Sequence, residues 1–269
     1  MSTKRSDTIT WLDVNSWQFN LAGRSLLVDP WLIGDLVFNN AGWLIRGIRP
    51  RPIPIPQQVD LLLLSQGLAD HAHPETLAAL DKSIPVVASA AAAKVAKEKG
   101  FTDVINLPPG QSHRLGDDLL IEALPGAPIG PLTQENAYII TVLDTGLRLY
   151  YEPHGYPDVA LATRPPVDVA ITPLVSLTLP VLGPVIRGGE GALELAQKAK
   201  PQWLLPTADG GDVGYEGLLA KFLTASGGAD VVRSQLANAN LSTEVKTLRP
   251  MEALTLDLKP QKPAAAETV

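Results

Sequence analysis

The chain has 269 residues, of which 45% are hydrophobic and 19% charged, and its formal net charge is −6. An acidic chain of this kind, without a basic stripe, is a poor candidate for nucleic-acid binding. The absence of cysteine excludes disulfides, thiolate metal sites and cysteine nucleophiles, so any metal must be held by histidine, aspartate or glutamate.

The amino-terminal segment MSTKRSDTITW lacks the apolar core of a secretory signal. No apolar run in the sequence approaches the ~20 residues needed to cross a bilayer. We therefore expect a soluble, cytoplasmic protein.

The first half of the chain predicts a strand-rich start followed by alternating strands and helices. Residues 8–32 predict three short strands. Residues 34–58 predict a long irregular segment, because the alternating prolines of RPRPIPIP disfavour helix and central strand. The next predicted elements are a buried strand at 59–65, a short helix at 74–80, a strand at 84–89, a helix at 90–100 and a strand at 103–107.

The second half begins with a strand-rich stretch at 113–174, which contains a hairpin around Asp144, Thr145 and Gly146. The order favours two mixed sheets with outer helices, in one domain at 1–258, over a single parallel sheet. The tail at 259–269 is expected to be disordered. The remaining predicted elements are a helix at 188–201, a strand at 202–207, helices at 215–225 and 229–240, and a pair of strands at 242–258.

The segment LLLLSQGLADHAHPETL, residues 61–77, runs from the buried strand into a polar loop. This loop carries Asp70, His71 and His73 within four positions. Imidazole and carboxylate groups are adequate ligands for zinc, iron or manganese. The loop is therefore a candidate metal site.

Several segments together resemble the metallo-β-lactamase-fold hydrolases, and most closely their ascorbate-phosphate-lactonase-like branch. The opening strands end in a DPW signature at 29–31, and SQGLADH at 65–71 is similar to the metal motif His-x-His-x-Asp-His. Later similarities lie in LRLYYEPHGYPD, VDVAITPL and KPQWLLPTADGG. The resemblance implies an α/β (α+β) fold, a four-layer αββα sandwich of two mixed sheets, and a metal-dependent hydrolase.

The ligand positions depart from the family pattern. Gln66 and Leu68 stand where the motif has its first two histidines, and His154 stands where the family has a bridging aspartate. The remaining family histidines map to Pro128, Ala208 and Val14. Because a two-zinc site needs several ligands for each ion, these departures indicate at most one metal.

The resemblance implies a rebuilt single-metal site made of Asp70, His71, His154 and Asp209. Asp209 is a candidate ligand or general base, and Asp70 is a candidate for orienting the attacking water. One ion with an open position lowers the pKa of bound water to about 7, which is enough for hydrolysis. The expected substrate is a small ester, lactone or phosphoester.

Purely structural roles for the same residues are alternatives to the single-metal site. Asp70 can cap the helix at 74–80, while His71 forms a hydrogen bond with a neighbouring loop. For His73 we favour a surface position at the start of this helix. The loop at 207–217, which includes Asp209, is either a solvated turn or a segment that adds a ligand or binds a polar substrate.

The most apolar stretch, ITPLVSLTLPVLGPVI at 171–186, predicts a strand followed by a buried loop over the cleft. The alternative is an exposed apolar lip that binds a lipid-like ligand, a membrane face or a partner. That lip would be joined by Trp31, Trp43, Leu44 and Ile45.

Two functions remain open from the sequence. One is a metal-dependent hydrolase with a single-metal site, and the other is a non-catalytic protein that binds a small molecule or a partner on the same scaffold. A metal-free hydrolase is disfavoured, since the chain has no nucleophile elbow and no convincing nucleophile and base. It also has no dinucleotide fingerprint.

Overall fold

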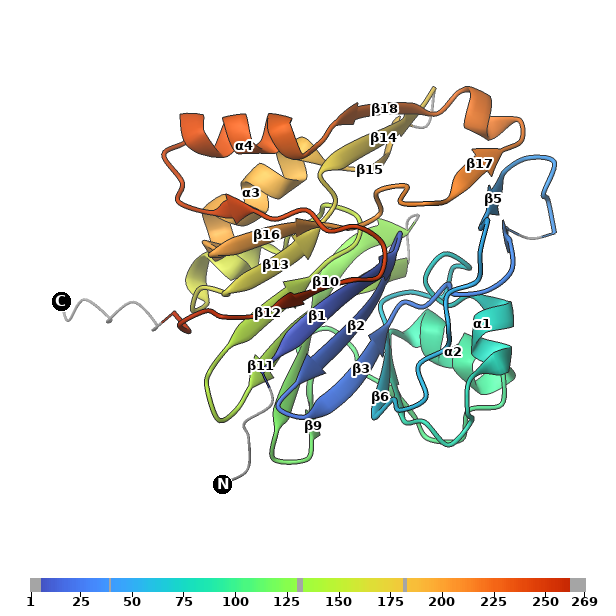
Figure 1. The fold of residues 1–269 in the computed structure, drawn as a ribbon, viewed down its shortest axis with the longest axis horizontal. Helices are drawn as coiled ribbons and strands as arrows, with labels where there is room; N and C mark the ends of the chain where they lie inside the picture. The colour runs from blue at the N-terminus through green and yellow to red at the C-terminus, as the bar shows by residue number, and fades with distance from the viewer. Residues whose placement is uncertain (1–5, 39, 130–132, 181–182, 262–269) are drawn as a thin grey trace.

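The computed structural model describes residues 6–38, 40–129, 133–180 and 183–261. Two seven-stranded sheets lie face to face, with two helices on the outer side of each (Figure 1). This is the four-layer αββα sandwich and mixed-sheet architecture that the sequence predicts.

The first sheet has the strand order β20-β1-β2-β3-β6-β7-β8. Its strands from β3 to β8 run parallel, and β1, β2 and β3 form an antiparallel meander. The bounds are β1 (Thr8–Asp13), β2 (Ser16–Leu21), β3 (Arg24–Val28), β6 (Leu61–Leu64), β7 (Val86–Ala88), β8 (Val104–Asn106) and β20 (Glu252–Thr255).

The second sheet has the strand order β19-β16-β13-β12-β11-β10-β9. Its strands from β12 to β19 run parallel, and β9 to β12 are antiparallel. The bounds are β9 (Ser112–Leu115), β10 (Leu119–Ile129), β11 (Thr133–Val142), β12 (Arg148–Tyr151), β13 (Val169–Thr172), β16 (Trp203–Pro206) and β19 (Glu244–Val245).

In the described part of the chain, four α-helices cover the outer faces. Apolar side chains of α1 (Pro74–Ala79) and α2 (Ala90–Glu98) pack on the first sheet, and those of α3 (Gly189–Ala199) and α4 (Ala229–Asn238) pack on the second. Two short 3₁₀ helices are present at Val159–Thr163 and Leu219–Lys221.

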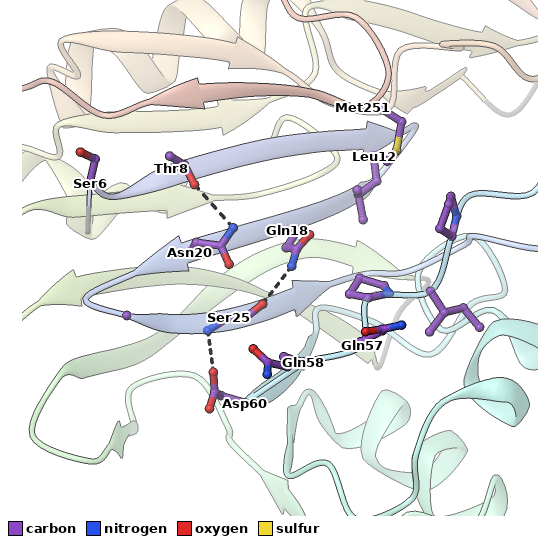
Figure 2. Close-up of a pocket in the computed structure, with 14 residues that line it drawn as sticks. Ser6, Thr8, Leu12, Gln18, Asn20, Ser25, Gln57, Gln58, Asp60 and Met251 are labelled. Carbon is purple, nitrogen blue, oxygen red and sulfur yellow. Dashed lines mark hydrogen bonds between the residues drawn. The ribbon is translucent and has the colours of Figure 1, made fainter. Parts of the chain in front are cut away.

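The outer face of the first sheet is polar over β1, β2 and β3. A groove of about 760 Å³ lies there beside the proline segment at 54–58 (Figure 2). Its polar groups bond to one another: Gln18 donates to Ser25 Oγ at 3.0 Å, and the Ser25 N–H donates to Asp60 at 2.8 Å. Several polar groups of the groove are therefore already paired with one another.

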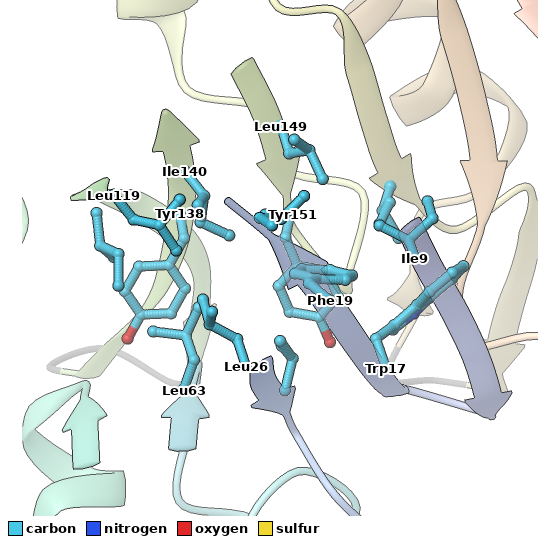
Figure 3. Close-up of a cluster of buried hydrophobic side chains, with 14 of the residues drawn as sticks. Ile9, Trp17, Phe19, Leu26, Leu63, Leu119, Tyr138, Ile140, Leu149 and Tyr151 are labelled. Atoms are coloured by element: carbon cyan, nitrogen blue, oxygen red, sulfur yellow. The ribbon is translucent and has the colours of Figure 1, made fainter. Parts of the chain in front are cut away.

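The space between the sheets is filled by large side chains from both inner faces (Figure 3). Trp17 and Phe19 of β2 are fully buried, as are Tyr138 of β11 and Tyr151 of β12. Each fully buried large apolar side chain contributes roughly 1.5–3 kcal/mol, so this layer fixes the docking of the two sheets.

Two small sheets extend the sandwich and correct three expectations. The order β17-β5-β4 joins Gly214–Glu216, Arg46–Ile48 and Leu36–Val37, so the segment at 34–58 is not wholly irregular. The order β15-β14-β18 joins Gly183–Ile186, Val175–Leu179 and Thr224–Gly227, so a hairpin replaces the expected buried loop at 171–186. The helix predicted at 215–225 was wrong, because this segment supplies β17, a 3₁₀ turn and the start of β18.

The carboxyl-terminal segment is anchored as far as it is described. The Gln261 N–H donates to Asp168 at 2.8 Å, and its side chain donates to Val167 and Lys200 carbonyls. The tail expected to be disordered from 259 therefore does not begin there, and residues 262–269 lie outside the described part. Among the described residues, no helix is long and apolar enough to cross a membrane.

Candidate metal centre

The candidate site lies at one edge of the sandwich, where strands of both sheets end. Parallel strands place their carboxyl ends at the same edge, so loops remote in the sequence meet there. The first sheet contributes the turn at 13–15 after β1, Asp29 after β3 and the loop at 65–73 after β6. The second sheet contributes the turn after β12 and the loop after β16.

Asp70 and His71 form the centre of the site. Asp70 Oδ2 lies 3.0 Å from His71 Nε2, and His71 is fully buried while the Asp70 side chain is 21% exposed. Backbone hydrogen bonds from His71 and Ala72 to the Leu68 carbonyl, at 3.0 and 2.8 Å, close the tight turn that presents both side chains.

The opposite nitrogen of His71 is held by Asp29. Asp29 Oδ2 lies 2.7 Å from His71 Nδ1, and it also accepts a hydrogen bond from Tyr151 at 2.8 Å. Its other oxygen accepts the Ser65 N–H at 2.7 Å. Asp29 is fully buried with φ of 43°, a left-handed conformation that aspartate tolerates better than most residues. The Asp29 of the DPW signature therefore fixes the orientation of the His71 ring.

His154 reaches the same place from the second sheet. The rings of His71 and His154 have centroids 5.1 Å apart. His154 Nδ1 lies 2.8 Å from Glu135 Oε2, and its Nε2 lies 3.4 Å from the amide nitrogen of Gln66. Each histidine thus has a buried carboxylate at Nδ1, with Nε2 toward the polar groups of the site.

The turn that carries His154 is held by Glu152. Its carboxylate accepts the backbone N–H groups of His154, Gly155 and Tyr156 at 3.0, 2.6 and 2.7 Å. A Cβ on Gly155 would lie 1.6 Å from the Arg187 carbonyl oxygen, and φ there is 81°, so glycine is required. This turn fixes His154 beside the His71 ring and Gln66.

Burial and charge act in opposite directions on the titrating groups. Burial alone would lower the pKa of His71, but Asp70 and Asp29 raise it well above the ordinary value. Burial would likewise lower the pKa of His154, but Glu135 outweighs it and the pKa is raised. For Asp70 burial would raise the pKa, but His71 and His154 lower it overall. The site therefore favours positive charge beside Asp70.

The donor set fits one metal ion. A neutral imidazole donates from only one nitrogen, whereas His71 has a carboxylate beside each of its two. The negative charge of these two carboxylates must be balanced by a second proton on His71 or by a cation near Asp70 and His71. Ligand atoms of Asp70, His71 and His154 all lie within 4.8 Å of one another, and Asp70 Oδ1 has no hydrogen-bond partner among the described residues.

A second ion in the family's arrangement does not fit. Leu68 is apolar and 44% exposed, and Gln66 offers only a neutral amide oxygen, which has no partner in the described part of the chain. A second group of carboxylates, Glu135 and Glu152 around His154, also has ligand atoms within 4.8 Å. Its Glu152 oxygens already accept three backbone N–H groups.

Asp209 is not brought into the group of Asp70, His71 and His154. It lies two residues after Thr207 in the loop that follows β16. The Thr207 hydroxyl is 3.4 Å from Asn15 Oδ1, and Asn15 Nδ2 is 3.2 Å from His71 Nε2. Burial raises the pKa of Asp209 to about 6, and its Oδ1 has no partner in the described part of the chain. Asp209 is thus a largely buried acid on the loop after β16, outside the group of proposed ligands.

The other sequence predictions have mixed outcomes. The cap of α1 is His73, not Asp70: the Thr76 N–H donates to His73 Nδ1 at 3.3 Å. His73 lies at the helix start as expected, but it is only 2% exposed and its ring lies 5.9 Å from that of Trp31, so a surface position was wrong.

Four site residues were not found from the sequence alone: Asn15, Asp29, Glu135 and Tyr151. For Asp29 the available signal was its place directly after a buried strand. Glu135 lies inside the long strand β11, where the alternating pattern gave no sign of a buried carboxylate. Both contact a histidine rather than forming part of a compact motif, so spacing did not reveal them.

Comparison with known proteins identifies the superfamily of the chain. Residues 8–208 match the family model of the beta-lactamase superfamily domain. The chain belongs to this superfamily. No match was found among curated proteins.

Solved structures share the fold of this superfamily member over nearly its whole length. A metallo hydrolase from Ignicoccus hospitalis is 15% identical, with a TM-score of 0.65 and coverage of 95% of this chain and 100% of that chain. An isothiocyanate hydrolase from Delia radicum gut bacteria is 16% identical, with a TM-score of 0.66 and coverage of 92% and 98%. The metallo-β-lactamase fold protein YhfI from Bacillus subtilis is 17% identical, with a TM-score of 0.59 and coverage of 93% and 100%. At these identities the likeness shows the metallo-β-lactamase fold.

Proposed function

We propose that this chain is a metal-dependent hydrolase with one divalent ion, held by Asp70, His71 and His154. The observation that carries the proposal is the convergence of these three ligands within 4.8 Å, with a buried carboxylate at Nδ1 of each histidine. Carboxylates at this position orient metal-binding imidazoles and raise their basicity. Zinc is the first expectation, with iron and manganese as alternatives.

When bound, the ion would supply Lewis acidity and lower the pKa of a bound water to about 7. Three protein ligands leave a position open for that water or for substrate. Asp29 holds the His71 ring through its Nδ1, and Glu135 lies 2.8 Å from Nδ1 of His154. Asp209, with its pKa raised to about 6, is suited to take or return a proton near neutral pH.

The proposed substrate is a small ester, lactone or phosphoester, as the resemblance to the ascorbate-phosphate-lactonase-like branch suggests. The proposed setting is the cytoplasm. Small molecules, not nucleic acids, are the proposed partners, since the chain carries a net charge of −6.

Metal analysis of the untagged full chain tests the metal. We expect about one equivalent of a divalent ion, lost in His71→Ala and kept in His113→Ala. His113 lies on β9 at the far end of the second sheet, so it is a matched histidine control. Equal metal content in wild type and His71→Ala would contradict the proposal.

Activity is tested separately, with p-nitrophenyl acetate, a γ-lactone and bis-p-nitrophenyl phosphate as probes. We expect metal-dependent turnover of at least one of them, reduced at least about 100-fold in Asp209→Asn. Turnover that is unaffected by chelation would exclude the metal route.

The second candidate is a non-catalytic binding protein on the same scaffold. It is favoured by four residues unsuited to metal binding at family ligand positions: Gln66, Leu68, Pro128 and Ala208. Thermal shift separates the two. Stabilisation by small organic ligands but not by divalent ions favours the binding protein.

A further inference from the structure

A buried arginine outside the candidate metal centre has half of its guanidinium unused. The Arg49 side chain is only 2% exposed, and its Nη1 donates to Asp13 Oδ2 at 2.8 Å. The face of the guanidinium lies over the Trp31 ring, 4.6 Å from its centroid. Its Nε and Nη2 have no hydrogen-bond partner in the described part of the chain. Burying a charged donor without a partner costs free energy, so we expect an acceptor at these two nitrogens.

The two unused nitrogens form one edge of the guanidinium. Nε and Nη2 carry parallel N–H bonds, and this is the edge that binds a carboxylate or a phosphate through two hydrogen bonds. Asp13 occupies only the other end, at Nη1. The Nε–Nη2 edge therefore has the shape that a second anionic group needs.

Asp13 cannot serve both ends. Its Oδ1 accepts the Val14 N–H at 2.9 Å, and its Oδ2 is held by Arg49 Nη1. A Cβ on Gly211 would lie 1.6 Å from Asp13 Oδ1, so the loop after β16 presses against the carboxylate. Asp13 is thus fixed in place, and the second acceptor must come from outside this pair.

A cavity of about 310 Å³ is lined in part by Arg49. Its lining includes Asp13, Arg49, Arg51, Asp212 and Met251. Arg51 is 84% exposed and meets Asp212 only at 3.8 Å, so this ion pair contributes little and leaves Arg51 able to approach an anion in the cavity. The shielding of Arg49 restricts the ligand to a small anionic group.

We propose that the Nε–Nη2 edge of Arg49 is a binding site for a single carboxylate or phosphate group. The site is separate from the Asp70, His71 and His154 ligands. The turn at 13–15 connects the two places, because Asp13 contacts Arg49 and Asn15 lies 3.2 Å from His71. The inference does not rest on the proposed function.

The test observes the Arg49 Nε–H group itself by nuclear magnetic resonance. Metal-free, ¹⁵N-labelled full chain is titrated with inorganic phosphate and, separately, with acetate, at constant ionic strength kept with chloride. The Arg49 signal is assigned by its loss in Arg49→Lys. We expect a saturable downfield shift of its proton, with phosphate alone identifying a phosphoryl site and acetate alone a carboxylate site. No saturable shift with either anion overturns the proposal and leaves water as the partner of this edge.

Calorimetry with the effective anion gives the second readout. Arg49→Lys keeps the positive charge for Asp13 but loses the two-pronged edge, so we expect at least about 10-fold weaker binding. Arg51→Lys is the matched control, with affinity expected within about threefold of wild type. His71→Ala is expected to keep anion binding, which separates this site from the metal. Equal affinity of wild type and Arg49→Lys would overturn the proposal.

Discussion

The carboxylate of Asp29 lies 2.7 Å from Nδ1 of His71, and both side chains are fully buried. Asp29 also accepts hydrogen bonds from Ser65 and Tyr151, so its position is fixed from both sheets. The His71 ring therefore has one orientation, with Nε2 directed at Asp70. This relationship determines how His71 can take a proton or a metal.

Asp29→Asn should weaken metal binding by about 10–100-fold, as is typical when the carboxylate behind a ligating histidine is lost. The amide keeps the shape of the side chain but removes its charge. Competition with a chromophoric chelator measures the effect, and Asp118→Asn, a change in a part-exposed ion pair with Arg24, is the control. Unchanged affinity in Asp29→Asn would show that Asp29 has only a structural role.

Metal affinity should keep rising with pH beyond the ordinary histidine pKa of 6.5, where it would otherwise level off. In the metal-free protein Asp70 and Asp29 raise the pKa of His71, so a proton competes with the ion to a higher pH than usual. Affinities measured between pH 6 and 9 check this. A profile that is flat above pH 6.5 would contradict it.

His73→Asn should make the protein less sensitive to acid. Burial lowers the pKa of His73 in the folded state, so the unfolded chain binds the proton more tightly. The wild type therefore loses stability as pH falls through about 6.5 toward the lowered folded pKa, and above 6.5 this loss is absent. Asparagine keeps a cap for α1 without titrating.

Urea unfolding of wild type and His73→Asn at pH 8 and pH 5.5 measures this difference. The shifts of His71 and His154 are present in both proteins and cancel in the comparison. Metal content should be the same in both. If both proteins lost the same stability between pH 8 and pH 5.5, groups other than His73 would cause the acid sensitivity.

Glu152→Ala should lower the free energy of unfolding by about 2–4 kcal/mol, because it leaves three backbone N–H groups of the His154 turn without their acceptor. Glu152→Gln keeps one acceptor oxygen and should cost less. Chemical denaturation of the metal-free proteins gives the values. Equal effects of the two substitutions would show that the charge of Glu152 matters and its acceptor oxygens do not.

Gly211→Ala should destabilise the loop after β16 by about 2 kcal/mol or more, since its Cβ would collide with Asp13 and its φ is 53°. Gly210→Ala is the matched control, because the nearest atom to its Cβ lies 4.0 Å away. Thermal melting of both variants compares them. Similar melting temperatures would mean that the loop yields without strain.

Most of the fold was predictable because the spacing of apolar residues in the sequence matches the pattern of burial along most elements. The apolar run of β6 is buried throughout, and the alternation of apolar and polar residues in β2 and the first part of β1 matches their burial. The segment at 215–225 misled because Leu218 and Phe222 are spaced as on a helical face but lie exposed, at 47% and 54%. There, pairing of Thr224–Gly227 with β14 determines the structure.

The candidate site was predictable only where its residues are neighbours in the sequence. Asp70 and His71 lie side by side, and the resemblance supplied His154. Glu135 and Asp29 act through a histidine from distant strands, and nothing in local spacing reports such a contact. His73 was misjudged because burial against Trp31 depends on how α1 docks, which is a tertiary property.

The proposed ligands come from both halves of the sandwich: Asp70 and His71 follow β6 of one sheet, and His154 follows β12 of the other. An ion bound by all three would link the two sheets, in addition to the apolar layer between them. Because the unfolded chain does not bring these ligands together, a free ion concentration of 100 times the dissociation constant would stabilise the fold by about 2.7 kcal/mol. Metal supply would then affect how long the protein persists in the cell, as well as any catalysis.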